Sequence, residues 1–177
     1  MLCAISLAAD YHPCLPSRSN RSHGTEAHII YKELTVYENL LYASEMRSEQ
    51  GTKHSTRLRL IEMALDLLGL QECRGFVCDP SLGKERLSGG QMRRLGIGIE
   101  LVCDPPVMLL DEPTSALDAS NAQLVTFALR DLAKRGILVI ASLHQPREAV
   151  FKLFDKLWLM RKGGARSSAL CHVRTLD

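Results

Sequence analysis

The fold of this chain is decided by the stretch VMLLDEPTSALD, residues 107–118. Four apolar residues run directly into two adjacent carboxylates, Asp111 and Glu112. A short, wholly apolar run is typical of a strand covered on both faces, as in a parallel sheet. Ligands of open α/β sheets bind at the carboxyl ends of the strands, so both acids are predicted to face a crevice. The alternative interpretation is a surface turn that begins at Asp-Glu-Pro.

The pentapeptide LSGGQ, residues 87–91, precedes this strand. Ser88 can cap a helix that begins near Gly90, with Gln91 in the reciprocal position of a capping box. Glycine leaves the first backbone N–H groups of the helix accessible, and a helix N-terminus attracts anions. The pattern fits a phosphate-binding loop, and it fits an ordinary capped helix after a turn equally well.

Two more polar residues belong to the same sheet edge or the loop beside it. Asp118 lies in the loop of the two carboxylates, and it also suits the N-cap of the helix that follows. His144 comes after a second apolar run, residues 137–142, and is predicted to enter the same crevice from the neighbouring strand. A neutral imidazole there can hydrogen-bond a phosphate and hold a water in line. Outside such a crevice, a lone histidine after a strand would be structural.

Strands and helices alternate between residues 29 and 164. Helices are predicted over 38–46, 58–68, 90–102, 121–135 and 147–154, and strands over 107–110, 137–142 and 156–160. The helix 121–135 is predicted to bury one side formed by Leu124, Ala128, Leu129 and Leu132. The order of strand, helix and strand predicts an α/β fold with a mostly parallel sheet and right-handed crossovers.

Composition limits the function classes. The net charge is +2 and Lys and Arg form no block, so composition gives no case for a nucleic-acid partner. The six cysteines form no C-x-x-C pair and are predicted to be reduced thiols. The apolar stretches are far shorter than the ~20 residues of a membrane span. Residues 1–28 are predicted to be a disordered leader, with a transit peptide as the alternative, and residues 165–177 an unmatched tail.

In this order and spacing, LSGGQ, VMLLDEPTSALD and SLHQP (residues 142–146) resemble the nucleotide-binding domain of ATP-binding-cassette (ABC) proteins. The strings ELTVYENLLYA (residues 33–43) and LHQPREAVFKLFDKLWLM (residues 143–160) are similar to subfamily G transporters. The resemblance covers residues 29–164. It implies a sheet of the P-loop NTPase (RecA-like) type, with a helical signalling subdomain at about 37–104 and a catalytic core part at about 105–164.

The resemblance also implies a role for each motif residue. Asp111 would be the Walker B residue that holds Mg²⁺ through water, and Glu112 the catalytic base. Asp118 would belong to the D-loop, and His144 would be the switch histidine. The signature loop that contacts ATP would consist of Leu87, Ser88, Gly89, Gly90 and Gln91.

The chain departs from the family pattern on its N-terminal side. No G-x-x-x-x-G-K-[ST] phosphate loop (Walker A) occurs in the sequence. The glutamine that such domains carry shortly before the ELTV-like string has no equivalent here, and Glu26 stands near its place. The sheet is therefore expected to be incomplete there, with an open edge. In this family two nucleotide-binding domains clamp ATP between the Walker A loop of one and the LSGGQ of the other. The resemblance thus implies a second such domain as partner, in a homo- or heterodimer, and little ATP binding by this chain alone.

The first interpretation is a fragment of the ATP-hydrolysing motor domain of an ABC transporter. The transmembrane domain would lie outside this chain, and the full-length protein would sit on the cytoplasmic side of a membrane. One alternative is a soluble cassette ATPase acting on nucleic acid or ribosomes, for which the sequence shows neither a coiled-coil insertion nor a basic surface. Another is a non-catalytic interaction protein that lends its signature loop to a complete partner.

Overall fold

The computed structural model describes residues 2–7, 22–24, 30–82, 85–115, 117–161 and 164–169. The chain divides into two compact units. One is Glu26–Pro105, and the other combines Met1–Thr25 with Pro106–Asp177. The family-based boundaries at residues 37–104 and 105–164 stay predictions. The unit that contains Pro106–Asp177 differs from them, because it also includes the N-terminal segment Met1–Thr25.

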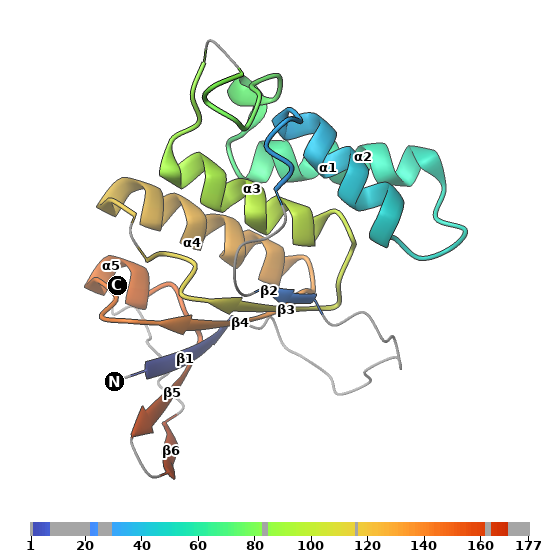
Figure 1. The fold of residues 1–177 in the computed structure, drawn as a ribbon. Helices are drawn as coiled ribbons and strands as arrows, with labels where there is room; N and C mark the ends of the chain where they lie inside the picture. Colours follow the sequence, from blue (N-terminus) through green and yellow to red (C-terminus); the bar gives the residue numbers. More distant parts are fainter. Residues whose placement is uncertain are drawn as a thin grey trace. The chain divides into compact units, whose positions relative to one another are not determined.

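The unit Glu26–Pro105 is helical in its described part (Figure 1). It contains α1 (Val36–Arg47), α2 (His54–Leu67), the short 3-10 helix η1 (Gln71–Cys73) and α3 (Gly89–Leu101). α1 begins at a capping box, in which the Thr35 N–H donates to Glu38 Oε2 at 2.8 Å. α2 ends before Gly69, whose φ of +59° is a conformation that favours glycine.

A leucine-rich core joins these three helices. The largest fully buried side chains of the unit are Leu40, Ile61, Leu65, Leu68, Leu70, Leu95 and Leu101. α3 approaches its neighbours closely at Gly98, where a Cβ would lie 3.1 Å from both Leu40 Cδ2 and Leu68 Cδ1. The absence of a side chain at this position therefore allows the tight packing of α3.

Gly98→Val is expected to destabilise the helical unit by about 1–3 kcal/mol, because the added side chain would overlap Leu40 and Leu68. Any gain from removing glycine from a helix is at most about 1 kcal/mol. Denaturant unfolding followed by circular dichroism measures the difference. Gly75→Ala is the control, since a Cβ there meets nothing within 4 Å. Equal losses in the two variants would contradict close packing at Gly98.

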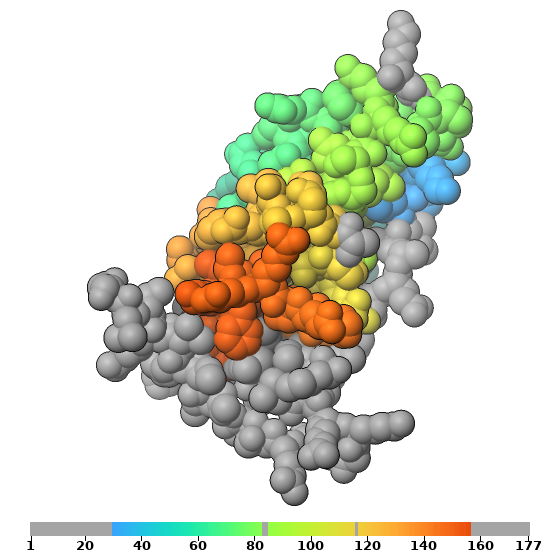
Figure 2. All heavy atoms as spheres, turned by 90° about the vertical axis from the view of Figure 1, so that its left-hand side faces the viewer, coloured from blue at the N-terminus to red at the C-terminus, as the bar shows by residue number. Residues whose placement is uncertain are grey.

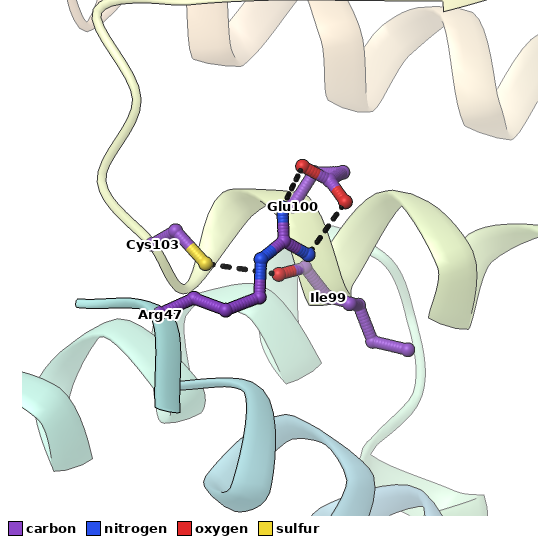
Figure 3. A network of polar contacts seen from close by, with 4 residues as sticks. All are labelled: Arg47, Ile99, Glu100 and Cys103. Carbon is purple, nitrogen blue, oxygen red and sulfur yellow. Dashed lines mark hydrogen bonds and ion pairs between the residues drawn. The ribbon is translucent and has the colours of Figure 1, made fainter. Parts of the chain in front are cut away.

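A buried carboxylate joins the last turns of α1 and α3 (Figure 3). Glu100 is 3% exposed, and its two carboxylate oxygens accept from Arg47 Nη1 and Nη2, each at 2.8 Å. The bidentate geometry fixes the position of both side chains. Beside this pair, burial raises the pKa of the Cys103 thiol, which the Arg47 guanidinium partly opposes. Burial likewise raises the pKa of Cys78 to about 11, so both residues are neutral thiols at pH 7.

The other unit is an α/β layer. Its described part holds a six-stranded sheet in the order β2-β3-β4-β1-β5-β6. The strands are β1 (Leu2–Leu7), β2 (Ser22–Gly24), β3 (Val107–Asp111), β4 (Leu138–Leu143), β5 (Lys156–Arg161) and β6 (Gly164–Ala169). The helices are α4 (Ala119–Lys134) and α5 (Glu148–Phe151). α4 packs against β4 and β1, and α5 packs against α4 (Figure 1).

The predicted α/β class is confirmed, and β3, α4 and β4 follow in the predicted order. The described sheet is mixed instead of mostly parallel, because β2, β3, β4 and β5 point one way and β1 and β6 the other. One predicted core residue is wrong: Leu124 is 52% exposed. The other three, Ala128, Leu129 and Leu132, are buried as predicted, and Val125 is buried in place of Leu124.

The N-terminal segment takes part in the sheet. A disordered leader is predicted for residues 1–28, whereas β1 and β2 fall within that range. β1 pairs with β4 on one side and with β5 on the other, so it takes a central position in the described sheet. The run LCAISL is short and mostly apolar, which suits a strand covered on both faces. Similarly, β6 extends into the predicted tail of residues 165–177.

Candidate functional site

Asp111 and Glu112 lie at the carboxyl end of β3, where the sequence predicts them. Asp111 is exposed and Glu112 is half-buried. Glu112 has a φ of 43°, in the left-handed region that residues other than glycine rarely adopt. Strained backbone of this kind gathers at functional sites, because the surrounding contacts must hold it in place.

Ser142 of β4 forms hydrogen bonds with both Asp111 and Glu112. It stands opposite Asp111 in the parallel register. Its Oγ donates to Asp111 Oδ1 and accepts from the Glu112 N–H at 2.9 Å. Its carbonyl oxygen accepts from the same N–H at 3.1 Å. The sequence does not single out Ser142, although this position follows once β3 and β4 are taken as parallel neighbours.

His144 comes directly after β4 and is exposed. Gln145 follows it with a φ of 48°, so the chain also turns through a left-handed residue after this strand. Because β3 and β4 are parallel and Asp111 pairs with Ser142, His144 belongs to the same sheet edge as the two acids. The segment that follows β4 (orange in Figure 2) lies open on the face shown.

Asp118 is the N-cap of α4, as the sequence predicts. Its Oδ2 accepts from the Asn121 N–H at 3.4 Å, and the Asn121 side chain donates to its Oδ1. The Asn121 side-chain hydrogen bond is the main reason why the pKa of Asp118 is held below its usual range. The D-loop role of Asp118 stays a prediction.

The LSGGQ segment forms the N-terminus of α3, in the helical unit. The predicted capping box is present: Ser88 Oγ accepts from the Gln91 N–H at 3.1 Å, and Gln91 Oε1 accepts from the Ser88 N–H at 2.8 Å. Leu87 and Gly90 are buried, whereas Ser88 and Gly89 are exposed. A Cβ on Gly89 would meet nothing within 4 Å. The first turn of α3 therefore leaves room for an anion at its positive end.

The metal-binding capacity of the sheet edge is limited. Within the described residues, no group of three His, Cys, Asp or Glu side chains could hold a metal ion. Mg²⁺ commonly binds through one or two carboxylates, with water and substrate phosphates completing its shell. Asp111 therefore fits Mg²⁺ whose shell is completed by water or by the phosphates of a ligand, and it does not fit an all-protein metal site. Glu26 lies outside the described residues.

β1 brings no loop to this edge. Its pairing with β4 runs from Cys3 opposite Leu143 to Leu7 opposite Val139, so its carboxyl end lies at the other edge of the sheet. A strand in this place that ran parallel to β4 would deliver the loop after it next to His144. The reversed direction of β1 excludes that arrangement for the strand itself.

Comparison with known proteins shows the family to which the chain belongs. Residues 12–115, more than half of the chain, match the family described as ABC transporter. The match begins upstream of residue 29, where the sequence alone suggests that the resemblance starts. ABC transporter G family member 25 of Oryza sativa subsp. japonica is 40% identical over 136 residues, which cover 77% of this chain and 13% of that protein.

A mammalian relative gives a similar result. The broad substrate specificity ATP-binding cassette transporter ABCG2 of Mus musculus is 38% identical over 138 residues, covering 76% of this chain and 20% of that protein. The chain thus spans a fifth or less of the length of these two relatives. None of the described helices is long and apolar enough to cross a bilayer.

The fold has a solved counterpart in the ADP conformation of MJ1267, an ATP-binding cassette of an ABC transporter. The TM-score is 0.63 at 23% sequence identity, over 80% of this chain and 58% of the other. At this level of identity the likeness concerns the fold alone, and it agrees with the predicted P-loop NTPase type.

Proposed function

The chain belongs to the ABC transporter family, and we propose that it is part of a subfamily G-like nucleotide-binding domain that binds and hydrolyses ATP to drive transport across a membrane. The observation that carries this proposal is the sheet edge at which Asp111, Glu112 and His144 follow two parallel strands. ATP hydrolysis needs a residue for Mg²⁺, a base or orienting group for water, and a partner for the γ-phosphate. These three side chains are of the right types for those tasks.

Each residue has one task in this proposal. Asp111 would hold Mg²⁺ through water, and Mg²⁺ would supply charge neutralisation on the phosphates when bound. Glu112 would accept a proton from the attacking water or orient that water. His144 would hydrogen-bond the γ-phosphate through its imidazole ring. The left-handed backbone at Glu112 sets the direction in which its side chain leaves the strand, and a costly conformation of this kind supports a functional role for the residue.

A complete ATP site would need two chains. This chain has an open helix N-terminus at Ser88 and Gly89, which can cover a phosphate. Its sequence contains no G-x-x-x-x-G-K-[ST] loop, and β1 runs in the wrong direction to bring such a loop to the sheet edge. We therefore expect a second nucleotide-binding domain to provide the phosphate loop, and only weak ATP binding by this chain alone.

The membrane partner belongs to the same proposal. The relatives described above are transporters by name, and the chain spans only a small part of their length. A transmembrane domain outside this chain would place the full-length protein at the cytoplasmic side of a membrane. The near-neutral charge of +2 gives no support for a nucleic-acid partner.

ATP-dependent association tests the proposal. In analytical ultracentrifugation, we expect the full chain to form a complex with a second nucleotide-binding domain that carries a G-x-x-x-x-G-K-[ST] loop, in ATP and Mg²⁺ but not in ADP. Gly89→Asp should weaken the complex at least about tenfold, because a carboxylate would face the phosphates. An acid in the first turn suits α3, so folding should be retained. Gly75→Asp, at an open position in the same unit, is the control.

Catalysis separates this proposal from the second candidate, in which the chain only lends its signature loop. In the assembled complex, Glu112→Gln should lower the rate of hydrolysis if the carboxylate of this chain works as a base, by about 10²-fold or more. An unchanged rate would favour the lending role. If neither ATP nor the Gly89→Asp substitution changes the association, both the catalytic proposal and the lending role are contradicted.

A further inference from the structure

We propose that Ser142 is a positioning residue that fixes the Asp111 carboxylate and the Glu112 backbone together at the end of β3. This inference rests on the proposed function, since it assumes that Asp111 holds Mg²⁺. Ser142 belongs to the neighbouring strand β4 and needs no ligand to make its contacts. It would therefore organise the two acids before a nucleotide arrives.

The contact with Asp111 sets the orientation of the carboxylate. Asp111 is exposed at the end of its strand, where an aspartate side chain can rotate. The hydrogen bond from Ser142 Oγ to Asp111 Oδ1 restricts this rotation. Partners of this kind, which orient a metal-holding group without touching the metal, commonly change metal affinity by about 10–100-fold when removed.

The contact with Glu112 holds the unusual backbone. The Glu112 N–H donates to both the Oγ and the carbonyl oxygen of Ser142, at 2.9 and 3.1 Å. Two acceptors on one residue of β4 therefore tie down the amide of a residue with a φ of 43°. The direction in which the Glu112 side chain leaves the strand depends on this backbone conformation.

The chemistry of the hydroxyl group explains the residue type. Ser142 Oγ donates to one acidic residue and accepts from the other, and a hydroxyl offers both a donor and acceptor lone pairs. Alanine at this position would keep the carbonyl contact and lose both hydroxyl contacts. Threonine would keep all of them. Because His144 follows Ser142 by two residues, the same short part of β4 sets the position of the histidine relative to both acids.

Mn²⁺ binding to the full chain is the first test, with Mn²⁺ as the probe in place of Mg²⁺. Electron paramagnetic resonance of free Mn²⁺ gives the affinity, and broadening of backbone amide signals in NMR locates the ion. We expect binding at the end of β3 that Asp111→Asn abolishes. Ser142→Ala should weaken it about tenfold or more, and Ser142→Thr should restore it. Thr126→Val is the control, because it removes a buried hydroxyl that donates to Ala122 O at 2.8 Å on α4.

Hydrogen exchange of the Glu112 amide is the second test, and it requires no metal. Loss of the Ser142 hydroxyl should speed this exchange about three- to tenfold, and leave the amides inside β4 unchanged. If the wild-type protein shows no Mn²⁺ binding that depends on Asp111, the proposed metal role of Asp111 is overturned, and with it the positioning role of Ser142. If Asp111-dependent binding is present and Ser142→Ala leaves it unchanged, Ser142 has at most a structural role and the inference alone is overturned. Unchanged Glu112 exchange in Ser142→Ala would also overturn it.

Discussion

Ile5→Pro is expected to lower the free energy of unfolding of the sheet unit by about 3 kcal/mol or more. Ile5 lies in the middle of β1, opposite Ala141 on β4 and Leu157 on β5. Proline has no backbone N–H, so it removes a hydrogen bond from the ladder, and it is found in sheets only at edges or bulges. Urea unfolding of the full chain, followed by circular dichroism, measures the loss.

Ile5→Val is the matched control, because it keeps the N–H and the β-branched shape and should cost less than about 1.5 kcal/mol. If proline and valine had the same small effect, β1 would not be a central strand in solution. A displaced β1 would also leave β4 and β5 with unpaired edges, which favour association between chains. Light scattering of the proline variant should therefore rise with protein concentration.

Local signals in the sequence predict the parts of the site that depend on neighbouring residues. The apolar run that ends in Asp111 and Glu112 locates β3 and its carboxyl end. The pair Ser88 and Gln91 predicts the capping box at the start of α3. In both cases the signal lies within a few neighbouring residues, so it can be found from the sequence alone.

The features that the sequence does not predict depend on contacts between distant segments. β1 reads as a short apolar stretch, and nothing in it indicates that it inserts between β4 and β5 in the reverse direction. Ser142 becomes a site residue only through its register with Asp111. The left-handed backbone at Glu112 has no signal in the sequence. A positive φ is normally predicted where a glycine stands, and this position holds a glutamate.

The exposure of Leu124 shows a different limit. Apolar residues on α4 fit two overlapping stripes, and helical periodicity does not choose between stripes that differ by one position. In the packing of α4 on the sheet, Val125 is buried and Leu124 is not, whereas Leu129 and Leu132 are buried in either stripe. Contact with other elements, and not the helix itself, therefore decides which leucines are buried.

Arg47→Ala is expected to destabilise the helical unit by about 2–3 kcal/mol, although it changes one side chain on the surface of α1. The Arg47 side chain is 45% exposed, but its partner Glu100 has a side chain that is only 4% exposed. Removal of the guanidinium leaves this carboxylate without two charge-assisted hydrogen bonds. Water that enters where Arg47 stood should keep the loss below the 3–5 kcal/mol typical of fully buried pairs.

Two further variants separate burial from charge. Lys134→Ala removes an ion pair to Asp131 in which both side chains are more than half exposed, so it should cost well under about 1 kcal/mol. Adding Glu100→Leu to Arg47→Ala should recover much of the loss, because no carboxylate then stays buried without its partner. Unfolding free energies of the four proteins, measured in the same denaturant, test this reasoning. Equal losses for Arg47→Ala and Lys134→Ala would mean that the burial of Glu100 contributes nothing to the stability of the contact between α1 and α3.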